Sequence, residues 1–213
     1  MTLAGLYAIT PDAGDSRALI ERVRVAMQAS APRGWAALQY RNKHAGAAQR
    51  EAEARELAAL CREHGVPLIV NDDVDLALAV GADGVHLGRG DGDLAAARAR
   101  MGNRLLGASC YDSLVSARRA IAAGADYVAF GSVFPSPTKP DAVRAPLSLF
   151  GQARALGVPL VAIGGITLEN ATEVIRAGAD CIAVISALFD APDIGERARI
   201  FTDFFSTRTS APV

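Results

Sequence analysis

Acidic and basic residues stand directly after short apolar runs of this chain, where they could handle phosphate chemistry. Asp72 follows the run LIVN, and Asp91 follows GVHLGRG. Arg41 and Lys43 follow the run LQY, and Lys139 lies in a later loop. Carboxylates beside cations suit Mg²⁺, which is often bound through one or two carboxylates plus the oxygens of substrate phosphates. These residues therefore predict a site for Mg²⁺ and substrate phosphate. The alternative is that Asp72 or Asp73 caps the next helix and the basic residues form surface ion pairs.

The segment QYRNK presents its polar residues in alternation. In an extended strand, successive side chains point to opposite faces. Gln39, Arg41 and Lys43 are therefore expected on one side, away from Tyr40 and Asn42. The two cations should face the same ligand.

A second anion site is expected near two other loops. Gly164 and Gly165 precede a predicted helix, and Ile185 and Ser186 follow another apolar run. Glycine lets the backbone approach a ligand closely, and free N–H groups at a helix start point at a bound phosphate. The alternative is that the glycine pair serves only a tight turn between a strand and a helix.

These residues are positioned by a regular alternation of elements. The phrase Gly-Ala-Asp recurs at 81–83, 124–126 and 178–180, each time between an alanine-rich helical segment and a short apolar run. Glycine suits the left-handed position that closes a helix, and a β-branched run suits a buried strand. Strands are expected near 6–10, 36–40, 67–71, 84–88, 105–109, 127–131, 159–163 and 181–185. Helices are expected near 16–30, 47–64, 74–80, 92–101, 113–123, 146–156, 168–177 and 194–205.

Eight such units predict an α/β fold, a single (β/α)8 TIM barrel, with an open doubly wound sheet as the alternative. In a barrel, the residues that follow each strand converge on one rim, so both predicted anion sites would lie there. One domain is expected over residues 1–213, with a flexible tail after about residue 206.

Several polar residues are assigned ordinary structural roles. Aspartate commonly caps helices, so Asp73 and Asp75 are assigned to helix starts. Asp12 could cap the first helix or reach the rim, and the cap is favoured. His86 stands inside an apolar run and is expected in the barrel interior. Cys110 has no histidine partner nearby in the sequence and is not expected to act as a nucleophile.

The composition limits the partners of the protein. Of 213 residues, 51% are apolar, and the formal net charge is -1, which argues against nucleic acid or an anionic membrane as the main partner. Three cysteines without a CxxC pair suggest reduced thiols. The first ten residues lack the features of an export signal, and no apolar run approaches the ~20 residues that span a bilayer. We expect a cytoplasmic enzyme.

The motifs LYAIT, LQYRNK, NDD, GADGVHLGRGD, GAS, FGSVFPSPTK, AIGGIT and AVIS together resemble the thiamine phosphate synthase family. The resemblance runs from about residue 6 to 190, in the same order and spacing. It implies a transferase that joins 4-amino-5-hydroxymethyl-2-methylpyrimidine diphosphate to a thiazole phosphate. The products would be thiamine phosphate and pyrophosphate, and the partners two phosphorylated small molecules.

The resemblance also implies roles for individual residues. Contacts to the pyrimidine diphosphate fall on Gln39, Arg41, Lys43, Asn71, Ser109 and Lys139, among which Arg41, Lys43 and Lys139 would act in catalysis. Contacts to the thiazole phosphate fall on Ser136, Thr138, Gly165, Ile185 and Ser186. Asp72 and Asp91 would hold Mg²⁺. The chain departs from the family pattern at Asp73, where arginine is frequent, and at Tyr111, where histidine is frequent.

Three alternatives stay open. A thiazole tautomerase relative would handle only the thiazole phosphate and would want an acid/base histidine on the rim. A non-catalytic barrel that binds a phosphorylated ligand would keep the pockets without turnover. A sugar-phosphate isomerase would explain the second anion site but not the predicted metal and diphosphate site. The oligomeric state, including a homo-oligomer, is also left open.

Overall fold

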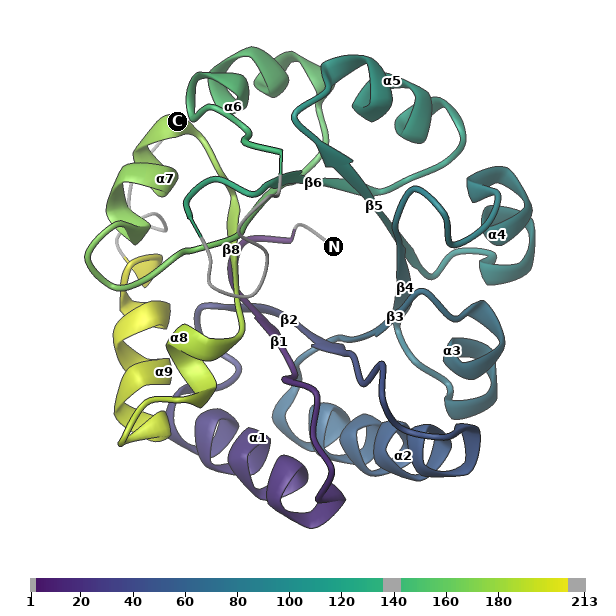
Figure 1. Ribbon diagram of the computed structural model, residues 1–213, viewed down its shortest axis with the longest axis vertical. Helices are drawn as coiled ribbons and strands as arrows, with labels where there is room; N and C mark the ends of the chain where they lie inside the picture. Colours follow the sequence, from purple (N-terminus) through teal and green to yellow (C-terminus); the bar gives the residue numbers. More distant parts are fainter. Residues whose placement is uncertain (1–2, 136–142, 207–213) are drawn as a thin grey trace.

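The computed structural model describes residues 3–135 and 143–206, which form a closed barrel of eight parallel strands (Figure 1). Each strand pairs with the next in the sequence, and β8 pairs with β1. The strands are β1 (Gly5–Ile9), β2 (Trp35–Tyr40), β3 (Leu68–Asn71), β4 (Gly84–Leu87), β5 (Leu105–Tyr111), β6 (Tyr127–Gly131), β7 (Leu160–Ile163) and β8 (Cys181–Val184). The predicted (β/α)8 barrel is confirmed.

Helices surround this barrel on its outside (Figure 1). They are α1 (Ser16–Ser30), α2 (Ala47–His64), α3 (Val74–Val80), α4 (Leu94–Met101), α5 (Leu114–Ala122), α6 (Ser148–Ala153), α7 (Ala171–Ala177), α8 (Ser186–Phe189) and α9 (Ile194–Asp203). Two differences from the expected pattern matter for function. The helix expected from about residue 168 begins at Ala171, and the four-residue α8 was not expected, because one turn is too short to show a helical period.

The core has two layers because successive residues of each strand point to opposite faces. Tyr7, Ile69 and Tyr127 belong to a buried cluster inside the barrel. Leu38 and Phe130 belong to the larger cluster between the sheet and the helices. Burial on both faces explains why the strands read as continuous apolar runs.

The Gly-Ala-Asp repeat ties neighbouring strands together where they begin. Asp83 accepts a hydrogen bond from Leu68 N at 2.8 Å, and Asp126 accepts one from Leu106 N at 2.7 Å. Asp180 likewise accepts one from Leu160 N at 3.0 Å. Each aspartate thus holds the first residues of the preceding strand, a role that the sequence pattern did not indicate.

The aspartates assigned to helix starts divide between two roles. Asp73 caps α3 by accepting from Leu76 N, as predicted. Asp75 lies in the first turn of the same helix but forms an ion pair with Arg100 instead of capping. The assignment of Asp12 was wrong: α1 is capped by Asp15, three residues later in the sequence.

Within the described ranges, no helix is long and apolar enough to cross a membrane.

Candidate active site

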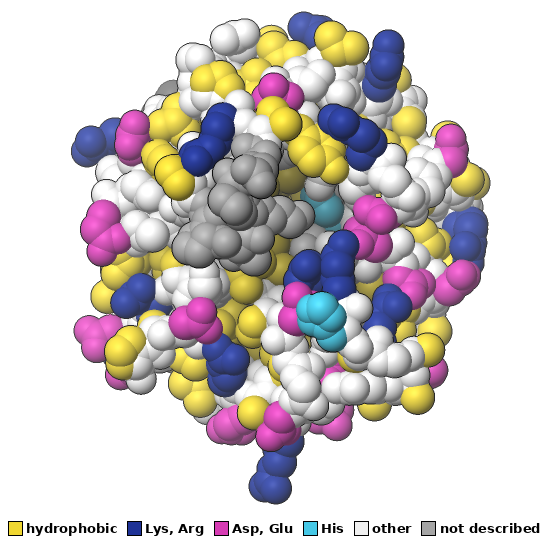
Figure 2. Space-filling model, in the orientation of Figure 1, with side chains coloured by type: hydrophobic (Ala, Val, Ile, Leu, Met, Phe, Trp, Pro, Cys, Tyr) yellow, Lys and Arg dark blue, Asp and Glu magenta, His cyan; other side chains and the backbone are white. Residues whose placement is uncertain are grey.

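The loops that follow β2, β3 and β4 bring acidic and basic side chains together on one face of the barrel. Figure 2 shows basic and acidic side chains side by side on the part of this face that lies over these strands. The first of two cavities here has a volume of about 230 Å³. It is lined by Tyr40, Arg41, Asn42, Lys43, Arg50, Asn71 and Asp72. The predicted diphosphate residues Arg41, Lys43 and Asn71 therefore meet in one place.

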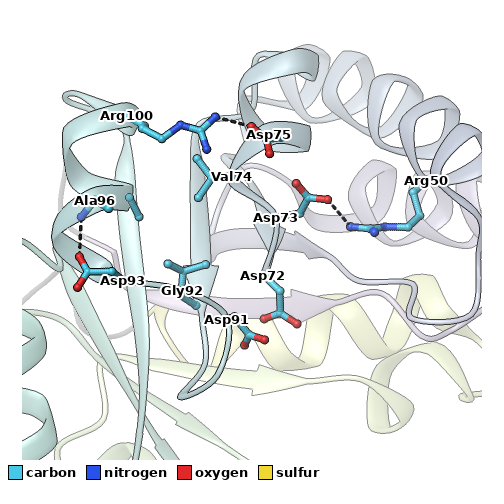
Figure 3. A pocket seen from close by; sticks show the side chains of 12 residues that line it. Arg50, Asp72, Asp73, Val74, Asp75, Asp91, Gly92, Asp93, Ala96 and Arg100 are labelled. Carbon is cyan, nitrogen blue, oxygen red and sulfur yellow. Dashed lines mark hydrogen bonds and ion pairs between the residues drawn. The ribbon is translucent and has the colours of Figure 1, made fainter.

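Asp72 and Asp91 lie next to each other at the ends of β3 and β4 (Figure 3). Burial, together with the hydrogen bond and charge of Asp91, raises the pKa of Asp72. Gly88 N donates to Asp91 at 2.9 Å, and Lys43 Nζ lies 3.3 Å from Asp72 Oδ2. Two carboxylates this close repel each other unless a cation or a proton lies between them. The pair therefore suits a divalent cation.

The coordination that this pair offers is incomplete by itself. In the described part of the chain, no group of three or more His, Cys, Asp or Glu side chains is arranged to hold a metal. Mg²⁺ characteristically keeps several waters and adds substrate phosphate oxygens to one or two carboxylates. Asp72 and Asp91 fit that pattern. The backbone of Asp72 is in the left-handed conformation, with φ of 64°. This conformation is uncommon outside glycine, asparagine and aspartate.

Asp12 binds residues 41–43, the cationic segment that contains Arg41 and Lys43. This contact corrects its assignment to a helix start. Its carboxylate lies 2.6 Å from Arg41 Nη1 and accepts from Lys43 N at 2.7 Å. Burial alone would raise the pKa of Asp12, but the hydrogen bonds from Lys43 and Arg41 outweigh it and lower that pKa. A sequence signal existed: Asp12 follows β1, so it stands on the same rim as the other functional residues.

Glu53 of α2 anchors the same segment from the outside of the barrel. It is 1% exposed and accepts from Tyr40 Oη at 2.7 Å and from Asn42 Nδ2 at 3.0 Å. Ser16 and Gln49 donate to its other oxygen. Tyr40 and Asn42 thus bind Glu53 on α2. Arg41 instead pairs with Asp12 and Lys43 with Asp72, in agreement with the predicted alternation.

Gln39 and Ser109 meet a polar network in the barrel interior. Gln39 is 3% exposed and donates from Nε2 to Tyr7 Oη at 3.1 Å. Ser109 Oγ lies 2.9 Å from His86 Nε2. The interior position predicted for His86 is confirmed, but its contact with Ser109 had no counterpart in the sequence analysis.

The glycine pair after β7 runs against the segment that follows β6. Gly164 and Gly165 have φ of 102° and 65°, and Phe134 N donates to Gly164 O at 3.0 Å. A Cβ on Gly165 would lie 2.8 Å from Phe134 Cβ and 2.3 Å from Pro135 O, so the close passage itself requires glycine. The helix predicted from about residue 168 begins at Ala171 instead, because a turn occupies residues 168–170.

Ser186 lies at the start of α8 and is exposed, directly after Ile185, which precedes this helix. The residues Ser136, Thr138 and Lys139 lie outside the described residues, as does the tail after residue 206. Of the residues predicted for the second anion site, the described part of the chain contains Gly165, Ile185 and Ser186.

A second cavity, of about 440 Å³, opens beside the acidic pair and extends between α3 and α4 (Figure 3). It is lined by Arg50, Asp72, Asp73, Val74, Asp75, Leu87, Asp91, Gly92, Asp93, Ala96, Ala97 and Arg100. Its arginines are engaged in ion pairs, Arg50 with Asp73 and Arg100 with Asp75. The carboxylates of Asp72 and Asp91 line its boundary with the rim.

Cys110 does not offer a reactive thiol. It is 1% exposed, and burial raises its pKa to about 12, which disfavours the thiolate that a nucleophile requires. Cys61 and Cys181 are also buried and free of disulfides.

Comparisons with known proteins agree over almost the whole chain. Residues 6–188 match the family described as thiamine monophosphate synthase. The chain is 58% identical to the thiamine-phosphate synthase of Aromatoleum aromaticum over 205 residues, which cover 95% of this chain and 97% of the relative. It is 57% identical to the thiamine-phosphate synthase of Chromobacterium violaceum, with 96% and 97% covered.

Solved structures include one of the same family and others that share only the fold. The thiamine phosphate pyrophosphorylase of Pyrococcus furiosus superposes with a TM-score of 0.84 at 38% identity, covering 97% of each chain. A 3-hexulose-6-phosphate synthase superposes with a TM-score of 0.67 at 18% identity, covering 93% of this chain and 99% of the other. That second similarity shows the shared barrel fold alone.

Proposed function

Because the chain belongs to the thiamine monophosphate synthase family, we propose that it joins 4-amino-5-hydroxymethyl-2-methylpyrimidine diphosphate to a thiazole phosphate and releases pyrophosphate. The observation that supports this activity most directly is the facing pair Asp72 and Asp91 beside Lys43. A carboxylate pair next to a cation is what a metal-bound diphosphate needs. A barrel that bound only a monophosphate would have no use for it.

The leaving pyrophosphate would be held by Arg41 and Lys43, with Lys139 as a third cation. As the carbon–oxygen bond breaks, its electron pair stays on the pyrophosphate oxygen, and negative charge grows there. Fixed cations stabilise that charge in the transition state. Asp72 and Asp91 would hold Mg²⁺, which when bound neutralises charge on the diphosphate.

The pyrimidine ring would lie over the barrel mouth, within reach of Gln39, Asn71 and Ser109. Its electron-rich amino group stabilises the positive carbon left by pyrophosphate. The thiazole nitrogen supplies the electron pair for the new carbon–nitrogen bond, so neither a general base nor a covalent residue is required.

The thiazole phosphate would lie against Gly165, Ile185 and Ser186, together with Ser136 and Thr138. Binding this phosphate away from the reacting atoms aligns the thiazole nitrogen with the pyrimidine carbon. Such alignment of two reactants can contribute several kcal/mol to lowering the barrier. The two anion sites therefore divide the work between charge neutralisation and alignment.

The activity is tested by giving the purified protein both substrates and Mg²⁺ and measuring pyrophosphate and thiamine phosphate. We expect both products in equal amounts, with none when either substrate is omitted and little when EDTA replaces Mg²⁺. Absence of pyrophosphate with both fresh substrates present would refute the proposal. Consumption of a thiazole phosphate alone would instead indicate a tautomerase.

We further propose that the full chain acts as one domain in the cytoplasm, where its three thiols stay reduced. Its partners would then be two phosphorylated small molecules. Size-exclusion chromatography with light scattering would determine the number of copies in solution.

A further inference from the structure

A chain of hydrogen bonds crosses the barrel interior through five side chains on five different strands. Tyr7 Oη lies 2.8 Å from Tyr127 Oη, and Tyr127 Oη lies 3.2 Å from His86 Nδ1. Gln39 joins the chain at Tyr7, and Ser109 joins it at His86. Four members are at most 7% exposed, while Ser109 is half-buried at the open end of the barrel.

The chain of hydrogen bonds can pass β5 because the residue of that strand at the crossing point is a glycine, Gly107, which has no side chain. Gly107 is in register with His86 on one side and with Tyr127 on the other. A Cβ at Gly107 would lie 2.1 Å from Tyr127 Cζ and 2.5 Å from His86 Nδ1. The glycine therefore provides the space in which the two rings meet, with centroids 5.6 Å apart.

The direction of the hydrogen bonds follows from the donor at one end. The Gln39 Nε2 group can only donate, so the Tyr7 oxygen accepts. The Tyr7 hydrogen is then available for Tyr127, and the Tyr127 hydrogen for His86 Nδ1. A ring nitrogen that accepts a hydrogen bond carries no proton, so a His86 ring that accepts at Nδ1 is neutral and carries a single proton. With Nδ1 accepting, that proton is on Nε2.

We propose that this buried chain holds His86 as the Nε2–H tautomer and thereby makes Ser109 a hydrogen-bond donor toward the substrate. Ser109 Oγ accepts from His86, so its own hydrogen is left for an atom at the open end of the barrel. The partner must be an acceptor, such as a ring nitrogen of the pyrimidine or an oxygen of its diphosphate. His86, Tyr127 and Tyr7 are then positioning residues.

The identity of this substrate rests on the proposed function, whereas the tautomer does not. The reverse direction would begin with Ser109 donating to His86 Nε2 and would leave Nδ1 protonated. Ser109 would then offer only lone pairs and would select a donor, such as an amino group. The protonated nitrogen of His86 therefore distinguishes the two directions before any substrate is added.

Nitrogen-15 NMR of the full-length protein, labelled at histidine, measures the tautomer directly. The chain has three histidines, so His44→Gln and His64→Gln assign the third signal by elimination. At neutral pH we expect His86 to be protonated at Nε2 and unprotonated at Nδ1. A proton on Nδ1, or an average of the two tautomers, would overturn the proposal, whether or not the protein is a synthase.

Kinetics then test the consequence for Ser109. Tyr127→Phe removes the donor to His86 Nδ1 and should allow both tautomers. We expect KM for the pyrimidine diphosphate to rise roughly tenfold, as for the loss of one hydrogen bond, with KM for the thiazole phosphate unchanged. In a Ser109→Ala background, Tyr127→Phe should have no further effect on the pyrimidine KM. A full effect in that background would show that Tyr127 acts through the barrel core instead.

Discussion

At the scale of single residues, the candidate site contains side chains held in unfavourable positions. Asp72 adopts a left-handed backbone and places its carboxylate beside that of Asp91. A carboxyl group whose pKa is raised on folding destabilises the folded state at neutral pH, because the unfolded state ionises more easily. The repulsion between Asp72 and Asp91 therefore lowers the free energy of unfolding of the metal-free protein.

Replacing Asp72 with asparagine should separate stability from activity. Asparagine tolerates the left-handed conformation and removes the repulsion from Asp91, so the unfolding midpoint without metal should stay equal or rise. Turnover should fall by a factor on the order of 100 or more, because charge on the leaving group is no longer neutralised. Thermal unfolding and a Mg²⁺ titration of the rate measure these two effects.

The matched control for this substitution is Asp75→Asn, on the first turn of α3. Asp75 is exposed and pairs with Arg100, so turnover should remain near the original value. An unchanged Mg²⁺ response in Asp72→Asn would place the metal elsewhere.

Asp12→Ala tests whether the cationic segment needs its carboxylate partner. The change removes the acceptor for Lys43 N and the ion pair with Arg41, so the segment should become less ordered. We expect KM for the pyrimidine diphosphate to rise roughly tenfold, since about 1.4 kcal/mol corresponds to one hydrogen bond to a charged group. The KM for the thiazole phosphate serves as the internal control, and a parallel rise in both would contradict this role.

At the scale of elements, helices and turns set the positions of the binding segments. The carboxylate of Glu53 accepts four hydrogen bonds and thereby holds the end of β2 against α2. Burial alone would raise the pKa of Glu53, but these hydrogen bonds outweigh it and lower that pKa. Its ionised form therefore stabilises the fold above the ordinary glutamate pKa of about 4.3. That stabilisation is lost as the pH falls through the lower pKa of the folded state.

Glu53→Gln should accordingly lower the free energy of unfolding by about 2–3 kcal/mol at pH 7, because a buried charged acceptor is removed. The difference from the original chain should shrink as the pH falls below about 4.3. Denaturant unfolding at pH 7 and in acid measures both values. Glu56→Gln, exposed on the same helix, should change neither, and a constant difference at all pH values would exclude the linkage.

Gly165→Ala tests the turn after β7. A Cβ there would strike Phe134 and Pro135, and φ of 65° disfavours alanine. We expect a loss of about 1–3 kcal/mol in the free energy of unfolding and a higher KM for the thiazole phosphate. Gly151→Ala in α6, where a Cβ meets nothing within 4 Å, should be neutral or stabilise by up to about 1 kcal/mol. Similar stability of the two variants would contradict the close passage.

At the scale of the whole molecule, the two ends of the barrel have separate tasks. The ends of the strands carry the candidate site, while the Gly-Ala-Asp aspartates hold neighbouring strands where they begin. In barrels of this type, the amino-terminal face serves stability and the carboxyl-terminal face serves chemistry. Substitutions at the two faces should therefore be separable.

Asp180→Ala should lower the free energy of unfolding by about 1–3 kcal/mol, because Leu160 N loses its acceptor. Both KM values should stay the same, since the site lies at the opposite end of the barrel. Denaturant unfolding and steady-state kinetics provide the two measurements. Asp203→Ala, exposed on α9, should leave stability within about 0.5 kcal/mol of the original.

Local sequence patterns were enough to predict the order of strands and helices and the barrel, and they brought Arg41, Lys43 and Asp72 to one rim, where they line one cavity. Helical periodicity, closing glycines and apolar runs are properties of neighbouring residues, and the convergence of strand ends follows from the barrel itself. Predicted alternation also separated Arg41 and Lys43, which pair with Asp12 and Asp72, from Tyr40 and Asn42, which bind Glu53 on α2.

Only the tertiary structure decided which polar side chains meet. Tyr7 and Tyr127 are 120 residues apart in sequence, and their contact depends on the register of strands around the barrel. The same reason explains why the contact between His86 and Ser109 was missed and Asp12 was misassigned. Hydrogen bonds between distant strands depend on relative height along the barrel axis, which no local pattern records. The sequence thus determined the residues available for the chemistry, and the closed sheet determined their partners.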